Sequence, residues 1–295
     1  MKVNTLKYIT FVQIIFVLFN INIIAQTSSS STNYFSIGNR LKFGNYLFTT
    51  KDYLRAIDEY KTVLKKLNSD TLLFKIGYSY EQMKYLSDAD FYFQKLSGSK
   101  NLSRIAEFEI LKTNFLEGSY DKVKQLFESQ DSSENEYYPN AAKLFYSTYI
   151  LGNNKLPDSS NYKLWFNAAG QTEIMNFYKR KINPGYKSPT LAAVLSTVVP
   201  GLGKIYAGET GDGITAFLFN GILGFLAYDN FRAHHKLRAW IFTGLTALFY
   251  GGNIYGSISA AQIYNAGIRF NFGKDFKIFL NKHNYFSPKY YFIYK

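Results

Sequence analysis

Three histidines are the first candidates for metal or acid–base chemistry in this sequence. His234 and His235 are adjacent, so they cannot share one face of a helix, and no acidic cluster stands beside them. A zinc site needs three or four converging ligands, and the third histidine, His283, is distant in sequence. Asp212 and Asp229 are lone carboxylates at predicted helix ends. The sequence therefore predicts no metal and no catalytic residue.

A glycine-rich segment and the cysteine count limit the chemistry further. "GLGKIYAG" looks like a phosphate-binding loop, but it lacks the glycine-lysine-serine/threonine ending and follows no predicted strand. No serine lies in a nucleophile elbow. The chain has no cysteine, which excludes disulfides, thiolate metal sites and a cysteine nucleophile. We therefore expect no cofactor and no enzymatic activity.

Polar side chains inside two apolar stretches leave one alternative open. Asn220 and Asn253 lie within these stretches, and with Asp212 and Tyr206 they would line a polar cleft. A polar residue in lipid usually has a partner or a function. Such a cleft would suit a small membrane transporter or a membrane enzyme. We favour a structural role, in which the two asparagines hydrogen-bond to each other.

The elements that carry these residues are two long uncharged stretches, 213–228 and 239–265. A membrane-spanning helix needs about 20 apolar residues. The second stretch is long enough, and the first is long enough if it begins near Gly211. The turn between them carries Arg232, Lys236 and Arg238, which favours a cytoplasmic turn. The sequence thus predicts a transmembrane helical hairpin.

The distribution of charge supports contact with a membrane. The net charge is +13, and residues 181–295 carry 12 basic but only 4 acidic residues. Because the basic excess lies in the segment with the apolar stretches, a lipid surface explains it better than nucleic acid. Residues 1–25 have a basic start and an apolar core, which predicts a signal peptide, or alternatively an uncleaved anchor. A serine-rich linker, 26–36, follows.

A turn rich in glycine precedes the first predicted span. "SPTLAAVLSTVV" is apolar but too short to cross a bilayer, and we expect it to form a half-inserted helix. Pro200 ends that helix, glycines allow a tight reversal, and Tyr206 suits the membrane interface. The residues of this predicted membrane-turn motif are Pro200, Gly201, Gly203, Tyr206, Gly208 and Gly213.

Small residues within the spans predict close contact between the two helices. Gly252 and Gly256 form a small-xxx-small pair. The predicted packing residues are Asn220, Gly221, Gly224, Gly252, Asn253 and Gly256.

Residues 37–136 repeat with a period of about 34 residues. The anchor positions combine a small residue, an aromatic residue and an alanine, and they are Gly44, Ala56, Tyr60, Gly77, Tyr80, Ala89, Phe93 and Phe127. This pattern resembles the tetratricopeptide family, with two good repeats and a degenerate third. The resemblance implies stacked helical hairpins whose concave surface binds a partner protein or peptide. Residues 137–184 follow as a predicted capping hairpin.

The segment from the turn to the second span, 185–265, resembles a family of small bacterial membrane domains of unknown function. The shared pattern is Pro-Gly-x-Gly-x-x-Tyr-x-Gly followed by a further glycine. Such domains occur behind periplasmic tetratricopeptide repeats in Gram-negative bacteria. The resemblance implies an inner-membrane location with the repeats in the periplasm, and it brings no known activity.

The tail, 266–295, allows two readings. It continues either as an interfacial amphipathic helix with Phe270, Phe272, Phe276, Ile278 and Phe279 toward lipid, or as strands formed by "IRFNF" and "KYYFIYK".

Together these patterns predict an all-α chain: a helical-repeat solenoid, a half-inserted helix and a transmembrane hairpin. We expect a non-enzymatic cell-envelope protein whose partners are a protein or peptide and membrane lipid, not nucleic acid. A soluble intracellular scaffold would require both spans to form a core helix pair. The sequence does not indicate an oligomeric state.

Overall fold

A computed structural model describes residues 33–130, 135–166 and 168–294. Every regular element in these ranges is a helix, so the predicted all-α class is confirmed. The chain divides into two compact units, residues 1–106 with 290–295 and residues 107–289. The predicted signal peptide and residues 26–32 of the predicted linker lie outside the described residues.

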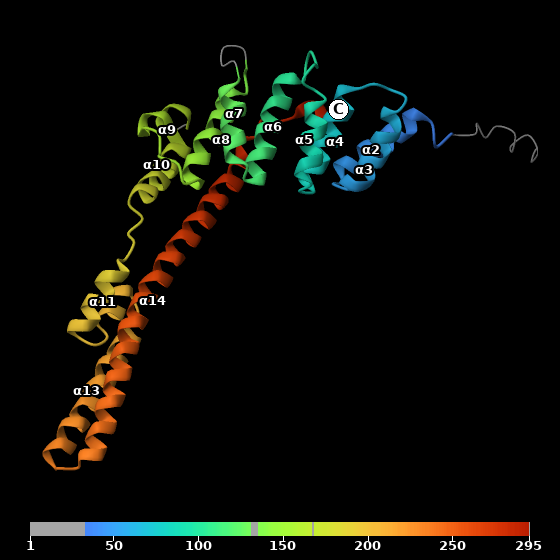
Figure 1. The fold of residues 1–295 in the computed structure, drawn as a ribbon. Helices are drawn as coiled ribbons and strands as arrows, with labels where there is room; N and C mark the ends of the chain where they lie inside the picture. Colours follow the sequence, from blue (N-terminus) through green and yellow to red (C-terminus); the bar gives the residue numbers. More distant parts are fainter. Residues whose placement is uncertain (1–32, 131–134, 167, 295) are drawn as a thin grey trace, which may run out of the picture. The chain divides into compact units, whose positions relative to one another are not determined.

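The first unit contains two pairs of helices. The pairs are α2 (Ile37–Thr49) with α3 (Tyr53–Leu64), and α4 (Asp70–Gln82) with α5 (Leu86–Gln94) (Figure 1). Side chains cap three of the four helices: Ser36, Asp52 and Ser69 each accept a backbone N–H from the first turn of α2, α3 and α4. A short 3-10 helix, η2 (Tyr291–Tyr294), also belongs to this unit and packs on α4.

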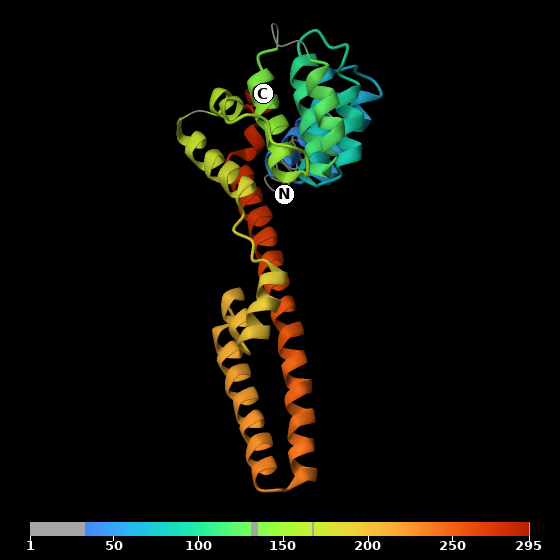
Figure 2. The same ribbon diagram turned by 60° about the vertical axis from the view of Figure 1, so that its left-hand side comes forward.

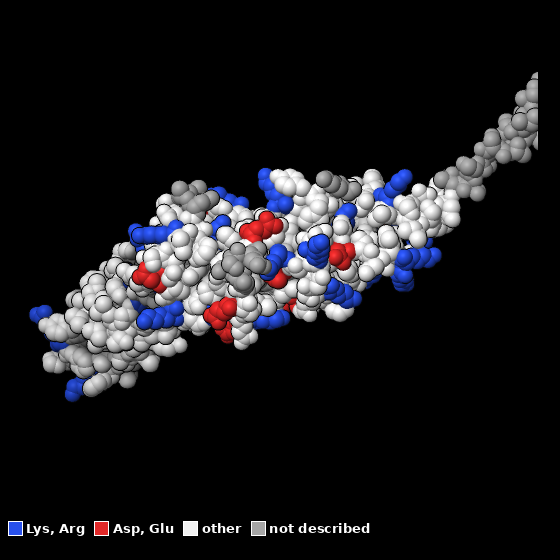
Figure 3. Space-filling view, turned by 90° about the horizontal axis from the view of Figure 1, so that it is seen from above, with Lys and Arg blue, Asp and Glu red and all other residues white. Residues whose placement is uncertain are grey.

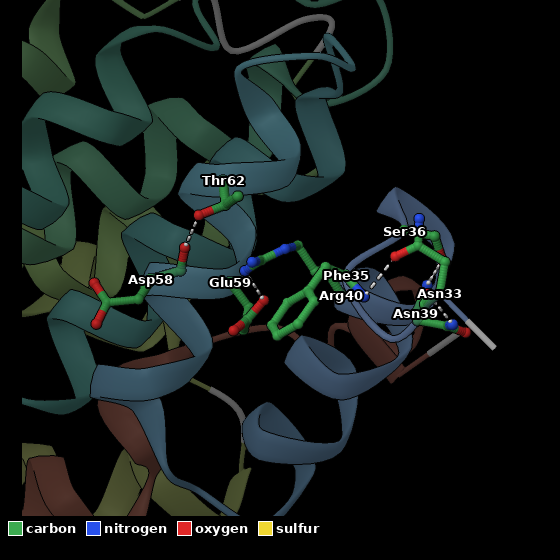
Figure 4. A network of polar contacts seen from close by, with 8 residues as sticks. All are labelled: Asn33, Phe35, Ser36, Asn39, Arg40, Asp58, Glu59 and Thr62. Carbon is green, nitrogen blue, oxygen red and sulfur yellow. Dashed lines mark hydrogen bonds and ion pairs between the residues drawn. The ribbon is translucent and has the colours of Figure 1, made fainter. Parts of the chain in front are cut away.

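A small polar network closes the start of the first pair (Figure 4). The Ser36 hydroxyl accepts the N–H of Asn39 at 3.3 Å, and Arg40 on α2 pairs with Glu59 on α3 at 3.0 Å. The Arg40 guanidinium also lies over the ring of Phe35, 5.2 Å from its centroid. Because these groups are partly exposed, they fix the orientation of α2 on α3 more than they stabilise it.

The two helix pairs use the same contact between glycine and an aromatic ring. A Cβ atom at Gly44 would lie 2.9 Å from the ring of Tyr60, and one at Gly77 would lie 2.8 Å from the ring of Phe93. Both rings are fully buried, so neither can move aside. Gly44 and Gly77 are 33 residues apart, as are Tyr60 and Phe93. The first helix of each pair can thus approach the second only because glycine stands at this position.

The second unit holds the remaining helices. They are α6 (Ser103–Glu117, from residue 107), α7 (Tyr120–Glu128), α8 (Tyr138–Leu151), α9 (Ser159–Trp165), α10 (Ala168–Ile182), α11 (Pro189–Val198), α12 (Leu202–Ala207), α13 (Thr210–Arg232), α14 (Lys236–Lys282) and the 3-10 helix η1 (Asn284–Phe286). One aromatic core joins α7, α8 and α10, and the stacked rings of Phe127 and Phe145, 4.3 Å apart, lie within it.

Helices α13 and α14 lie side by side, and only residues 233–235 connect them (Figure 2). The rings of Phe219 and Phe249 pack at 5.1 Å, and those of Phe231 and Trp240 pack at 5.5 Å near the turn. The short helices α11 and α12 pack against α14 and, through α12, against the start of α13. Residues 185–265 therefore form one packed group of four helices.

Helix α14 continues well past the expected end of the second span. Its last turns pack on α10, where Phe276 and Phe279 are buried against Phe177 at 4.9 and 5.5 Å. Two ion pairs reinforce this contact, Arg180–Asp275 at 3.0 Å and Lys282–Glu173 at 2.7 Å.

The expectation that the aromatic residues of the tail face lipid is therefore wrong for Phe276 and Phe279. Phe272 also packs on Phe177, whereas Phe270 and Ile278 are exposed. The alternative of strands is wrong too, since residues 266–282 are α-helical and residues 291–294 form a 3-10 helix. Helical spacing predicted an apolar stripe, but it did not reveal that the stripe meets protein.

Candidate functional site

The glycines of the turn motif let backbone segments touch. Gly201 has φ +89°, in the left-handed region, and a Cβ there would overlap the carbonyl oxygen of Gly213. A Cβ at Gly213 would lie 2.5 Å from the Ile205 side chain and 2.6 Å from the oxygen of Gly201. The turn thus holds α12 against the first residues of α13.

A second close approach joins α12 to α11. A Cβ at Gly203 would overlap the carbonyl oxygen of Ala192, and the Gly203 N–H donates to the Ser196 hydroxyl at 2.9 Å. That hydroxyl also hydrogen-bonds the hydroxyl of Ser257 on α14 at 2.6 Å. Both serines are buried. One buried polar chain therefore connects α12, α11 and α14.

The other motif residues complete this turn. Pro200 follows α11, and Gly208 ends α12 with φ +101°. The Tyr206 hydroxyl accepts the N–H of Ser188 at 3.0 Å, so it caps protein backbone instead of only facing water as expected. Lys187 exchanges two 2.8 Å hydrogen bonds between its backbone and the Asn265 side chain. The motif is thus a packing device that fixes α11 and α12 on α14.

An open cleft of about 710 Å³ lies between α12, α13 and α14. Lys204 and Asp212 line it together with Asn220 and Asn253. The two asparagines do not bond to each other. Asn220 donates to the carbonyl of Ala216 at 2.8 Å, while its oxygen and both polar atoms of Asn253 have no hydrogen-bond partner. The structure therefore brings the asparagines to one cleft but does not show the expected pair.

The glycines inside the spans do not lie at a helix contact. A Cβ at Gly221, Gly224 or Gly252 would meet nothing within 4 Å, and one at Gly256 would meet only the flexible end of Lys204, at 3.1 Å. Leu223 and Ala227 are instead the buried apolar residues of α13. Exchanging Gly252 and Gly256 for leucine is thus not expected to separate the helices, because spacing alone did not show which face of α14 meets α13.

Large apolar side chains cover the outside of α13 and α14. Those exposed are Ile214, Phe217, Leu218, Phe219, Ile222, Phe225, Tyr228 and Phe231 on α13, and Leu237, Trp240, Ile241, Leu245, Leu248, Phe249 and Tyr255 on the facing part of α14. Contiguous apolar surface of this kind marks a site of contact with lipid or protein. Figure 3 shows the basic and acidic side chains of one face of the molecule.

Among the described residues, α13 is the helix long and apolar enough to cross a membrane. The sequence had favoured 239–265 over 213–228, and the structure reverses that order. Helix α13 begins at Thr210, which gives it 23 residues, whereas Gly251, Gly252 and Asn253 lower the hydropathy of α14.

The repeat anchors lie in the cores of the helix pairs. Ala56, Tyr60, Ala89 and Phe93 are fully buried, and Phe127 is buried as well. Tyr80 is half-buried; its hydroxyl accepts a hydrogen bond from Lys61 at 2.7 Å. Of the tyrosines that could face a partner, Tyr46 and Tyr85 are exposed.

Sequence reasoning missed a set of buried lysines. Lys75 on α4 and Lys112 on α6 are buried, and Lys143 on α8 is partly so. Desolvation lowers the pKa of Lys75 and of Lys143. Lys112 pairs with the buried Glu109 at 2.7 Å. A lysine at a helical position normally indicates a solvent-exposed face, so no signal in the sequence identified these residues.

No protein-family model matches this chain, and no curated protein matches it either. Among the described residues, no group of three or more His, Asp or Glu side chains is placed to hold a metal ion. Any assignment of function therefore depends on the geometry above.

Proposed function

We propose that this chain is a non-enzymatic protein of the cell envelope. In this proposal a helical-repeat domain outside the cytoplasm binds a partner protein or peptide, and α11–α14 hold it at the membrane. The observation that carries the proposal is the continuous apolar surface of α13 and α14. In water such a surface would drive aggregation, whereas in lipid it is the expected exterior of a hairpin.

The dimensions and side chains of the hairpin support insertion. A helix of 23 residues is about 34 Å long, which is enough to cross a hydrocarbon core of about 30 Å. Tyr228 and Trp240 are exposed next to the turn, where aromatic side chains favour a membrane interface. Arg232, Lys236 and Arg238 make the turn basic, which favours a cytoplasmic location for it.

The repeated contact between glycine and ring supports tetratricopeptide-like repeats. Gly44 with Tyr60 and Gly77 with Phe93 occur at one period, and the alanines at 56 and 89 are buried in step with them. Stacked helix pairs of this type present long surfaces for extended partners. Binding is thus the function that this architecture serves best, although the inference from fold to function is one of analogy.

The cleft at Asn220 and Asn253 favours a second candidate, a small membrane transporter or membrane enzyme. Two buried carboxamides without a full set of partners are costly in lipid and suit a polar ligand. However, the other residues around the cleft within the spans are mostly apolar, including Phe219, Leu248 and Phe249. Such a lining offers few groups for a path across the bilayer, so we place binding first.

Lysines placed on the apolar surface test membrane insertion. Ile222 and Phe225 are 58% and 64% exposed near the middle of α13. The double variant Ile222→Lys/Phe225→Lys is expected to lose most of its membrane-integrated protein, because each lysine in the bilayer centre costs about 2.5–3.5 kcal/mol by insertion scales. Alkaline extraction followed by flotation in a density gradient measures the integrated fraction.

The matched control places lysines on the repeats. Leu54→Lys/Phe91→Lys changes two residues that are also more than half exposed, and it should leave the integrated fraction unchanged. In a soluble scaffold the α13 variant would instead be neutral or more soluble. Full retention of the α13 variant's yield in the soluble fraction would therefore refute the anchor.

The orientation is tested separately with reporters fused after residues 130, 235 and 295. We expect a reporter that works only in the periplasm to be active at the first and third positions and inactive at the second, because two spans return the chain to the same side. Activity at the second position alone would reverse the topology and contradict an exported repeat domain.

A further inference from the structure

We propose that residues 284–293, the tail segment, are an internal ligand of the helix pairs, and that a partner binds by displacing them. The inference rests on the proposed partner binding and adds to it the site, the chemistry of the partner and a competitor within the chain. It is carried by contacts that the tail segment makes within each of the two units.

In the second unit, the tail segment crosses α6 and α8. Lys112 on α6 donates to the Ser287 hydroxyl at 3.0 Å, and the side-chain amide of Asn140 on α8 donates to the carbonyl of Phe286. The Tyr285 ring packs on Phe115 at 6.4 Å. The Lys143 ammonium lies 5.6 Å from the centroid of the Phe286 ring, within the range of a cation–π contact.

In the first unit, the same segment ends on α4. The ring of Tyr290 packs edge-on against Phe74 at 5.3 Å and against Tyr78 at 5.9 Å. Phe292 contacts Phe74 as well, at 5.0 Å. Ile293 is 1% exposed. These aromatic side chains bury the end of the chain as firmly as residues of the core.

The helices that the tail segment contacts share one feature: α4, α6 and α8 are each the helix that precedes a shorter partner helix in sequence. In both units the tail segment thus chooses the same kind of surface. The buried or partly buried lysines Lys75, Lys112 and Lys143 lie on these same three helices. A surface with rings, buried cations and amide donors recognises aromatic side chains and backbone carbonyls.

The tail segment is held in a form that can be released. Asn284, Tyr285 and Phe286 have φ values of 48°, 49° and 57°, so three successive residues other than glycine adopt the left-handed conformation. Such strain persists only while the surrounding contacts maintain it. The printed backbone hydrogen bonds of the segment are local, for example Ser287 to Asn284 at 2.9 Å, so its departure disrupts no other element.

These contacts define the partner as an extended segment rich in Tyr and Phe. It would place rings where Tyr285, Phe286 and Tyr290 lie, and it would offer an acceptor to Lys112. An external segment competes with a tail that is covalently attached and therefore present at high effective concentration. Binding by the full chain is thus expected to be weak until the tail segment is removed.

A labelled peptide of residues 284–295 tests the competition by fluorescence anisotropy in detergent. We expect it to bind the chain that ends at residue 283 at least tenfold more tightly than the full chain. A matched peptide with alanine in place of Tyr285, Phe286 and Tyr290 is expected to bind at least tenfold more weakly. A truncated chain that keeps its helical circular dichroism but does not bind the peptide would overturn the proposal, as would equal binding by the full chain.

Cross-linking in the full chain covers the case in which truncation prevents folding. Because the chain lacks cysteine, Asn140→Cys with Ser287→Cys introduces the only thiols, and a short bis-maleimide should join them. Glu128→Cys with Ser287→Cys, on the outer helix α7, is the control that should not react. Unlabelled peptide is expected to lower the yield of the first pair several-fold, and the alanine peptide is not.

Each other outcome of the cross-linking contradicts the proposal. No product from the 140/287 pair would mean that the tail segment does not lie on α8. A yield unaffected by the peptide would mean that the segment is a fixed structural element, and a product of twice the chain mass would mean that the tail of a second copy occupies the surface. None of these results would affect the membrane anchor, which the lysine variants of α13 test independently.

Discussion

Gly203→Ala is expected to lower the free energy of unfolding of the α11–α14 group by about 3 kcal/mol or more. A methyl group there would overlap the carbonyl oxygen of Ala192, and backbone atoms cannot yield as a side-chain end can. Helices α11 and α12 would have to separate, which would break the hydrogen bonds from the Gly203 N–H to Ser196 and from Ser196 to Ser257. Each buried bond contributes about 1 kcal/mol.

The measurement is unfolding of the full chain in detergent, followed by circular dichroism. Gly211→Ala is the matched control: it lies eight residues away in the first turn of α13, and a Cβ there meets nothing within 4 Å. That variant should be neutral or more stable by up to about 1 kcal/mol, since alanine favours a helix over glycine. Equal midpoints for the two variants would contradict the close packing of α11 on α12.

The turn illustrates what a sequence can and cannot predict. Glycine spacing correctly predicted a tight reversal at Gly201 and Gly208, because positive φ angles strongly favour this residue. Spacing did not predict that Gly203 touches α11, since that contact depends on a partner 11 residues away. The glycines of the spans followed a packing motif equally well, yet Gly221, Gly224 and Gly252 face open space. A motif identifies small residues, but only the arrangement of helices shows which of them are approached.

The repeats and the tail give a similar division. The period of 33 residues placed Gly44, Tyr60, Gly77 and Phe93 in register before any coordinates, because helical periodicity and residue size decide such contacts locally. The burial of Phe276 against α10 and of Tyr290 against α4 joins residues far apart in the chain. Nothing local specifies such pairs, so the sequence offered a lipid-facing stripe or strands where the structure has core packing.

The buried ion pair on α6 makes the second large prediction. Lys112→Met is expected to destabilise the chain by about 3–5 kcal/mol, because it leaves the Glu109 carboxylate in the core without its ammonium partner. The side chains of Lys112 and Glu109 are 3% and 0% exposed, and the lysine Nζ lies 2.7 and 2.9 Å from the two carboxylate oxygens. The variant also removes the donor to Ser287, so the tail segment should loosen at the same time.

Lys124→Met provides the control on the neighbouring helix α7. Lys124 also pairs with an acidic residue three positions away, Asp121, at 3.1 Å, but the Asp121 side chain is 91% exposed. An exposed pair contributes less than about 1 kcal/mol, so this variant should unfold near the wild-type midpoint.

A double variant separates burial of the charge from loss of packing volume. Glu109→Leu/Lys112→Met removes both charges and is expected to recover a large part of the stability lost in Lys112→Met, since an apolar pair of similar volume tolerates the core. The measurement is a double-mutant cycle of denaturant unfolding with the two single variants. If the losses of Glu109→Leu and Lys112→Met instead simply add, the two side chains are not coupled, and the lysine's contribution lies in its packing alone.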